Sequence, residues 1–279
     1  MALVPKEGVQ FSLSPASDAL RASTPVSQAL DRLVVYFRDH ITLDESYPWD
    51  LMFVHSIKAL ASWRAFAEGA GAVKGRGREL ESMKASWIYD LVCGFLCHGF
   101  GGTSVRDLAM AQPPSIFRSK DLLQTWILAY GIVYWSPLDL GYQLISTPRS
   151  LTSLVVTTFE AIDSSTTVCG SVDKARQLFP NSPAAPFVAA FLAGIGGSIL
   201  RYLERRLGRG WDHEQTEWSR PTEGLRRTIL YTVLYMVLSK THGKTKARLW
   251  IATFHVAVSI ARELTDLPLD ITAPAAGFF

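Results

Sequence analysis

Cysteine is scarce in this sequence, and so is charge. The chain has 3 cysteines among its 279 residues, too few for a disulfide scaffold. Charged residues make up 19% of the chain, below the roughly 25% of typical soluble domains. The net charge of +3 is too small to indicate a nucleic-acid partner. Because 8 Trp and 14 Phe also exclude a disordered chain, composition leaves a large helical soluble protein or a polytopic membrane protein.

The motifs of common catalytic sites are missing as well. The sequence has no Gly-x-Ser-x-Gly, no phosphate loop ending in Lys-Ser/Thr and no His-Glu-x-x-His, the signatures of several catalytic and nucleotide-binding sites. We therefore predict no enzyme, no cofactor and no metal site. One alternative stays open, because Cys93 and Cys97 share a helical face near His98 and suit a soft metal in a membrane-embedded metalloenzyme. Small packing thiols are the simpler interpretation.

The first 45 residues differ in character from the rest. Met1–Thr24 is rich in Ser, Ala and Pro and has no apolar run long enough for the core of a signal peptide. Over Ser27–Ile41, apolar residues recur at helical spacing with charges on the other faces, which predicts an amphipathic helix. We predict a polar N-terminal segment over residues 1–45, the main domain over residues 46–267 and a short tail over residues 268–279.

From Tyr47 onward, clusters of charge alternate with long gaps that contain no Asp, Glu, Lys or Arg. A helix that crosses the hydrocarbon core of a membrane needs about 20 mostly apolar residues, whereas gaps of about 10 to 14 residues also suit buried helices of a soluble protein. Several gaps reach the greater length with their flanking turns. We predict an all-α membrane protein with seven transmembrane helices, centred near Lys58, Gly99, Ala129, Thr157, Leu192, Leu234 and Phe254. A soluble helical protein is the alternative.

A glycine-rich sequence occurs twice. Residues 99–106 (GFGGTSVR) match residues 194–201 (GIGGSILR) in three glycines, a hydroxyl residue, an aliphatic residue and an arginine. Three helices are an odd number, so a duplicated three-helix unit enters the membrane in opposite orientations. We predict two inverted three-helix repeats plus a final helix, an arrangement typical of transport pathways. A secondary transporter shares this pattern.

Glycine weakens a helix interior and favours kinks. We predict that the glycines of each copy interrupt the helix that carries them, and that the two interruptions line or gate a cation pore. The glycines are Gly99, Gly101 and Gly102 in the first copy and Gly194, Gly196 and Gly197 in the second. The structural alternative is that small residues let helices pack closely.

Ionisable residues inside the predicted helices are costly, and they usually face the bundle interior or water. Glu160 and Asp163 are three residues apart and share one helical face, where their charge would attract cations to a pore. Lys58 in the first predicted helix is a candidate partner for either carboxylate; alternatively, its long side chain extends to the membrane interface. The structural alternative pairs Glu160 with Arg106 or Arg201.

Six short motifs occur in a recognisable order. They are Gly99-Phe100-Gly101-Gly102, Ser136-Pro137-Leu138-Asp139-Leu140 with Tyr142, Phe159-Glu160-Ala161 with Gly170, Gly194-Ile195-Gly196-Gly197-Ser198, Gly210-Trp211 and Pro221-Thr222. With them, Trp87–Leu264 resembles the trimeric intracellular cation (TRIC) channel family, and Tyr47–Arg64 looks like its first helix. The resemblance implies seven helices in two inverted triplets plus a last helix. It also implies a homotrimer in membrane lipid with one pore per protomer, passing potassium as counter-ion when calcium leaves the endoplasmic or sarcoplasmic reticulum.

The resemblance also concerns a lipid site. In animal members, a Lys-Glu-Val motif in the fourth helix, with an arginine four residues after the lysine, holds a phosphoinositide headgroup. Here Phe159 stands at the lysine position and Asp163 at the arginine position. Loss of both cations predicts weak or absent phosphoinositide binding at this place. The remaining candidates for lipid binding or helix pairing are Arg106, Arg149 and Arg201.

Overall fold

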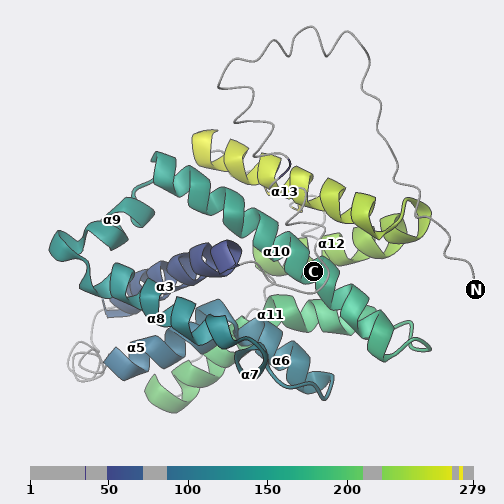
Figure 1. The fold of residues 1–279 in the computed structure, drawn as a ribbon, viewed down its shortest axis with the longest axis horizontal. Helices are drawn as coiled ribbons and strands as arrows, with labels where there is room; N and C mark the ends of the chain where they lie inside the picture. Colours follow the sequence, from purple (N-terminus) through teal and green to yellow (C-terminus); the bar gives the residue numbers. More distant parts are fainter. Residues whose placement is uncertain (1–34, 36–48, 72–86, 210–221, 266–269, 273–279) are drawn as a thin grey trace, which may run out of the picture. The chain divides into compact units, whose positions relative to one another are not determined.

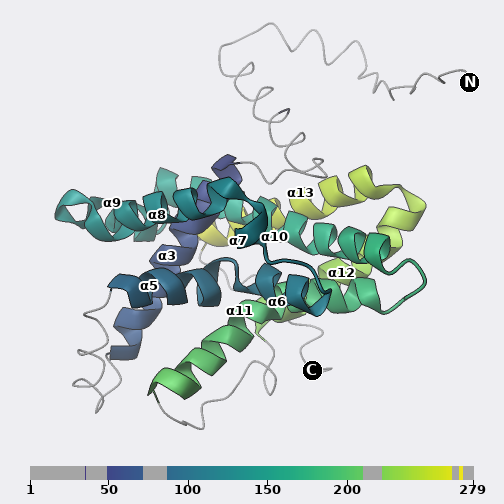
Figure 2. The same ribbon diagram turned by 60° about the horizontal axis from the view of Figure 1, so that its bottom comes forward.

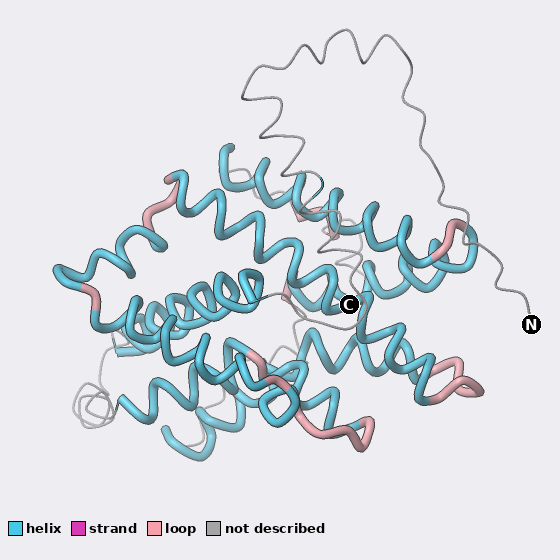
Figure 3. Tube along the Cα trace, viewed as in Figure 1, coloured by secondary structure: helices cyan, strands magenta, loops and turns pink. Residues whose placement is uncertain are grey.

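The computed structural model describes residue 35 and residues 49–71, 87–209, 222–265 and 270–272. Every regular element among these residues is a helix (Figures 1 and 3), which confirms the predicted all-α class for this part of the chain. Two compact units are distinguished, Met1–His40 and Ile41–Phe279, and the helices named below belong to the second. The amphipathic helix predicted over Ser27–Ile41 lies outside the described residues except for Val35.

The helices follow one another without strands in the described ranges. In chain order they are α3 (Trp49–Gly71), α5 (Trp87–Gly94), the π-helix η1 (Phe95–Gly99), α6 (Gly101–Ala109), α7 (Ser115–Arg118), α8 (Lys120–Trp135), the 3₁₀ turn η2 (Pro137–Asp139), α9 (Leu140–Ser146), α10 (Leu151–Leu178), α11 (Ala185–Arg209), α12 (Glu223–Thr241) and α13 (Lys244–Thr265). Each predicted segment centre falls within one of these helices. By length and composition, one described helix is apolar enough to cross a membrane, Ala185–Glu204 within α11. The count of seven spans therefore stays a prediction.

Several helix ends follow from local chemistry. The Ser150 hydroxyl accepts a hydrogen bond from the Ser153 N–H at 3.0 Å and so caps α10. The Thr222 hydroxyl caps α12 in the same way through the Leu225 N–H at 3.3 Å. Such caps satisfy N–H groups that have no partner within the helix. Between α12 and α13, Gly243 has a φ of 83°, a left-handed conformation that glycine adopts without steric cost.

The corner between α8 and α9 is held by a side chain from another helix. Leu138 and Asp139 both have left-handed backbones, with φ of 54° and 61°, which is unfavourable for residues other than glycine. The Arg64 guanidinium on α3 donates to both carboxylate oxygens of Asp139, at 2.6 and 2.8 Å. It also donates to the Val133 carbonyl at 2.8 Å. This bidentate pair ties the strained corner to α3.

Two larger hydrophobic clusters lie on different sets of helices. The first surrounds Trp126 and draws on α3, η1, α8 and α9. The second surrounds Val172 and Tyr235 and draws on α10, α11, α12 and α13. α10 packs along α13 and α11, α3 packs on α8, and α6 packs on α11 (Figures 1 and 2). α3 contacts α10, and α6 contacts α11; the candidate site lies where these helices meet.

Candidate functional site

The helix that carries the first glycine motif is interrupted. The Phe100 N–H donates to the Phe95 carbonyl at 2.8 Å and closes a wide π turn. Phe100 itself has a non-helical backbone, with φ −99° and ψ 12°. Its carbonyl accepts from the hydroxyls of Thr103 at 2.9 Å and Ser104 at 2.8 Å. The break between α5 and α6 thus lies within the motif, and π turns inside helices are frequent at functional sites.

The second glycine motif does not interrupt its helix. α11 is one α-helix from Ala185 to Arg209 and runs straight through Gly194–Gly197, so the predicted interruption is wrong for this copy. Each interior glycine disfavours a helix by about 1 kcal/mol. Packing of the glycine faces against α6, η1 and α12 stabilises the continuous helix against that cost.

The glycines of the two motifs bring helix backbones into direct contact. A Cβ atom added to Gly102 would lie 2.1 Å from the Ala193 carbonyl oxygen. One added to Gly196 would lie 2.9 Å from the Gly102 Cα, and one on Gly197 would lie 3.0 Å from the Cys97 carbonyl oxygen. Only residues without a Cβ allow helices this close. The structure therefore shows close packing of α11 on α6 and η1, and a pore-lining role stays a prediction.

The other three glycines of the motifs also lie at tight contacts. A Cβ on Gly194 would meet the Thr228 side chain of α12 at 2.6 Å, and one on Gly99 would meet the Trp126 ring at 3.0 Å. At Gly101 it would lie 1.7 Å from the Leu96 carbonyl oxygen, so the interruption itself requires glycine there.

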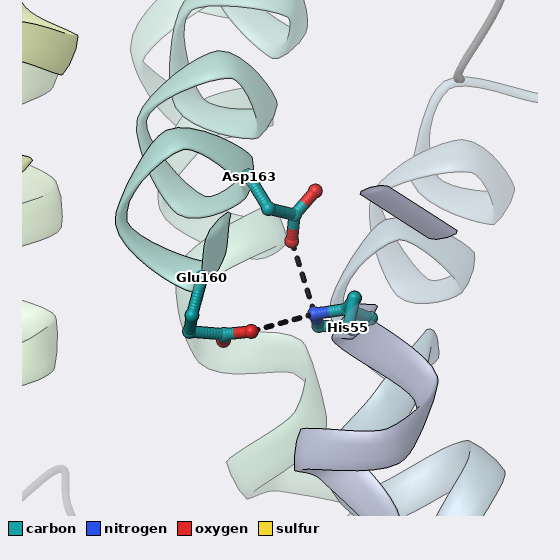
Figure 4. A group of neighbouring side chains, drawn as sticks. All are labelled: His55, Glu160 and Asp163. Atoms are coloured by element: carbon teal, nitrogen blue, oxygen red, sulfur yellow. Dashed lines mark hydrogen bonds and ion pairs between the residues drawn. The ribbon is translucent and has the colours of Figure 1, made fainter. Parts of the chain in front are cut away.

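Three ionisable side chains converge beside this interruption. His55 of α3 directs its Nδ1 atom at the carboxylates of Glu160 and Asp163 on α10 (Figure 4). The Nδ1 atom lies 3.1 Å from Glu160 Oε2 and 3.0 Å from Asp163 Oδ2. On the other side of the ring, Nε2 donates to the Gly99 carbonyl at 3.3 Å. The Glu160 side chain is 36% exposed and that of Asp163 is 6% exposed, so one carboxylate faces outward and the other is enclosed.

The partners of Glu160 differ from those predicted. The structural alternative paired Glu160 with Arg106 or Arg201, whereas its carboxylate contacts His55 at 3.1 Å in the structure. Lys58 lies one turn along α3 and is half-buried. No ion pair of its side chain is seen among the described residues, and its pairing with either carboxylate stays a prediction. The sequence analysis missed His55. The signal was available, since a histidine within a predicted transmembrane helix is rare and usually functional.

The predicted arginines lie in three different environments. Arg106 donates to Asp107 at 2.7 Å and to the Ser171 hydroxyl of α10 at 2.8 Å. Arg201 has its Nη1 atom 3.3 Å from His98 Nε2 and so joins α11 to η1. Arg149 is exposed before α10, where its backbone N–H donates to Glu263 at 3.1 Å. Arg106 and Arg201 thus lie between helices.

The three residues considered for a metalloenzyme, Cys93, Cys97 and His98, do not form a metal-binding group in the described part of the chain. Among the described residues, the group of His, Cys, Asp and Glu donors within reach of one ion consists of His55, Glu160 and Asp163. Cys93, Cys97 and His98 do not form such a group, and the Arg201 guanidinium lies beside His98. A cation at that position disfavours a second one through charge repulsion.

Asp107 is the centre of a network of ion pairs that joins three helices. It is 0% exposed, and it pairs with Arg106 at 2.7 Å and with Lys174 of α10 at 2.8 Å. Arg118 of α7 pairs with its second oxygen. This single carboxylate links α6, α7 and α10 and pairs with three cations, although its one negative charge neutralises only one of the three positive charges. Breaking such a buried network is costly, because the remaining charges lose their partner.

Comparison with known proteins identifies the family. The sequence profile described as TRIC channel matches residues 82–265, more than half of the chain. The chain belongs to the TRIC channel family. This confirms the resemblance found in the sequence, and members of the family are ion channels rather than enzymes.

Individual TRIC channels are similar in sequence to this chain over most of their length. The trimeric intracellular cation channel type B of Homo sapiens is 22% identical over 235 residues, covering 81% of this chain and 80% of the human protein. That of Rattus norvegicus is 23% identical and covers 70% of this chain and 68% of its own.

Solved structures show the same fold. A TRIC counter-ion channel studied for its activity in calcium release has a TM-score of 0.63 at 18% identity, over 78% of this chain and 93% of its own. A trimeric intracellular cation channel from C. elegans with bound Ca²⁺ has a TM-score of 0.63 at 17% identity, over 85% of this chain and all of its own. Both confirm the all-helical fold.

Proposed function

We propose that this TRIC channel conducts monovalent cations, above all potassium, across the endoplasmic or sarcoplasmic reticulum membrane. The current would act as counter-ion flow during calcium release, through one pore in each protomer of a homotrimer. Relatives of similar sequence are named trimeric intracellular cation channels, and a structure of the same fold is described as a counter-ion channel in calcium release.

The acidic pair on α10 is the observation that carries this proposal. Glu160 and Asp163 lie beside the interrupted helix, and the Gly99 carbonyl lies on the other side of the His55 ring. A protonated His55 offsets at most one of the two negative charges, and among the described residues no lysine or arginine forms an ion pair with either carboxylate. Negative charge that is not cancelled by a fixed cation raises the local concentration of mobile cations.

A membrane location for several helices is supported by where their apolar side chains lie. Large apolar residues at i, i+4 spacing are about half exposed on three helices: Leu123 and Ile127 on α8, Val233 and Val237 on α12, and Trp250 and Phe254 on α13. Charged residues such as Asp107, Asp173 and Arg248 are buried instead. Polar interiors with apolar outer faces are typical of proteins surrounded by lipid. We therefore retain seven spans over residues 46–267 as part of the proposal.

The arrangement of repeats belongs to the same proposal. In it, α3, α5 with α6, and α8 form the first triplet, α10, α11 and α12 form the second, and α13 is the final helix. The two glycine motifs then lie in the middle helix of each triplet, where α6 and α11 contact each other. Residues 1–45 and 268–279 flank this channel domain.

The test is electrical recording of the purified protein in planar bilayers. We expect potassium-selective unitary currents, and we expect Glu160→Gln to reduce the conductance at least about twofold in low salt, because a carboxylate that concentrates cations is lost. The reduction should shrink in high salt, since mobile ions screen the charge. Glu263→Gln on α13 is the matched control, and its conductance should equal that of the wild type.

Two results would contradict the channel proposal. Saturable, substrate-coupled flux without unitary currents would establish the alternative of a secondary transporter. Equal conductance of wild type and Glu160→Gln at every salt concentration would remove the role of the acidic pair.

Phosphoinositide binding at α10 should be weak or absent in this TRIC channel. Phe159 and Asp163 replace the two cations that the family resemblance would require, and the carboxylates of Glu160 and Asp163 would repel a phosphate group. We expect no saturable binding of a water-soluble short-chain phosphoinositide in calorimetry, and weak binding at most after Phe159→Lys alone. Tight binding that Phe159→Lys leaves unchanged would show that another site, such as one at Arg149, holds the lipid.

A further inference from the structure

Two helices bring three potential metal ligands to one point. His55 is contributed by α3, and Glu160 and Asp163 by α10 (Figure 4). One ligand atom of each residue lies within 4.8 Å of the other two. His55 Nδ1 lies 3.1 and 3.0 Å from the carboxylate oxygens of Glu160 and Asp163. Ligand atoms about 2.1 Å from a tetrahedrally coordinated zinc ion are about 3.4 Å apart, so these groups need to separate by only a few tenths of an ångström to admit an ion.

The orientation of the histidine ring supports a cation between these groups. The Gly99 carbonyl can only accept a hydrogen bond, so Nε2, at 3.3 Å from it, carries a proton. In the neutral ring, Nδ1 then presents a lone pair toward two carboxylates, and this arrangement needs either a second proton or a metal ion at Nδ1. A histidine that donates its other N–H to a backbone carbonyl is the usual arrangement of a metal ligand.

The carboxyl group of Asp163 gives a second, independent indication. Its side chain is 6% exposed, and its Oδ1 atom is buried without any hydrogen-bond partner. A buried carboxylate oxygen without a partner is costly. An ion held by both oxygens of Asp163 would satisfy this atom. With His55 neutral, the two carboxylates also leave two negative charges, which one divalent ion would neutralise.

We propose that His55, Glu160 and Asp163 form a binding site for one divalent transition-metal ion per protomer, with zinc favoured. Imidazole nitrogen selects zinc and its neighbours, whereas Mg²⁺ and Ca²⁺ prefer oxygen ligands only. Three protein ligands from two helices leave room for water to complete the coordination. The C. elegans channel of the same fold is described with bound Ca²⁺, so calcium is the necessary comparison.

The site would also regulate the channel, and this part rests on the proposed function. A bound divalent ion cancels the negative potential of Glu160 and Asp163 and joins α3 to α10 beside the interrupted helix. Micromolar zinc should therefore reduce potassium conductance, and a chelator should restore it.

Direct binding is the primary test, because it does not depend on currents. The full chain is purified in detergent with an affinity tag that contains no histidine, stripped with a chelator and titrated with Zn²⁺ by calorimetry. We expect one ion per protomer, and we expect His55→Ala and Asp163→Asn each to weaken binding at least about tenfold, as even loss of a ligand's supporting partner does. His98→Ala is the matched control, since it removes a histidine outside the group. Size-exclusion chromatography checks that each variant remains assembled.

The outcomes separate the two proposals. Absence of stoichiometric zinc binding to the wild type, or unchanged affinity in both ligand variants, would overturn the site. Calcium binding as tight as zinc would overturn the assigned ion class. If zinc binds as expected but no currents are found, the metal site stands and the channel function fails. Currents that are unaffected by bound zinc would remove the regulation alone.

Discussion

Replacing Gly102 with alanine should destabilise this TRIC channel, although alanine is the better helix former. The added Cβ would lie 2.1 Å from the Ala193 carbonyl oxygen. This neighbour is a backbone atom, so no rotamer change can relieve the clash, and α6 and α11 must move apart. Overpacking of this kind costs about 1–3 kcal/mol, which exceeds the propensity gain of about 1 kcal/mol at most. Thermal unfolding in detergent, followed by tryptophan fluorescence, should show a midpoint several degrees below that of the wild type.

Gly170→Ala is the matched control for this experiment. Gly170 lies within α10, and a Cβ there would meet no atom within 4 Å. This variant should be as stable as the wild type or up to about 1 kcal/mol more stable, because alanine favours the helix. An unfolding midpoint for Gly102→Ala at or above that of Gly170→Ala would contradict the close backbone contact between α6 and α11.

Replacing Asp107 with asparagine should destabilise the protein even more. The substitution preserves the shape of the side chain but removes the charge that offsets Arg106, Lys174 and Arg118. Asp107 itself is completely buried, and the Arg106 side chain is 10% exposed, so this guanidinium is left buried without its carboxylate. Lys174 and Arg118 are 22% and 43% exposed, and water can solvate these two cations in part. Loss of one partner from a buried ion pair costs about 3–5 kcal/mol. We expect a large decrease in unfolding temperature and in the yield of folded protein.

An exposed ion pair provides the control for Asp107. Glu223 contacts Arg262 at 2.8 Å, and the Arg262 side chain is 48% exposed. Surface pairs contribute about 0–1 kcal/mol, so Glu223→Gln should shift the midpoint only slightly. Equal losses in Asp107→Asn and Glu223→Gln would mean that the buried network does not stabilise the fold as inferred.

The positions of the helices were predictable from the sequence because they depend on local patterns. Each predicted segment centre, such as Ala129 and Thr157, falls within a helix in the described residues. Glycine and proline marked two real features, the interruption at Phe95–Phe100 and the corner at Pro137–Asp139. The same reasoning failed at Gly194–Gly197, because helix propensity is a weak local term that packing against neighbouring helices outweighs.

The candidate site was only half predictable. Glu160 and Asp163 could be placed on one face because their spacing of three residues is a property of a single helix. Their partner His55 is 105 residues from Glu160 in the chain, and no local pattern specifies which side chains two distant helices bring together. The structural alternative for Glu160 was an arginine partner, but Arg106 pairs with Asp107 and Arg201 lies beside His98.

The sequence by itself determined the helical class, the helix positions and the family. Residue spacing, gaps in charge and the order of motifs depend only on the order of residues along the chain. Only the tertiary structure decided what the conspicuous residues do. In the structure the glycines lie at contacts between helix backbones, Arg106 and Arg201 contact residues other than Glu160, and His55 lies beside Glu160 and Asp163. The physical reason is that these contacts depend on how closely and at what angle α3, α6, α10 and α11 pack, and packing is set by all of their side chains together.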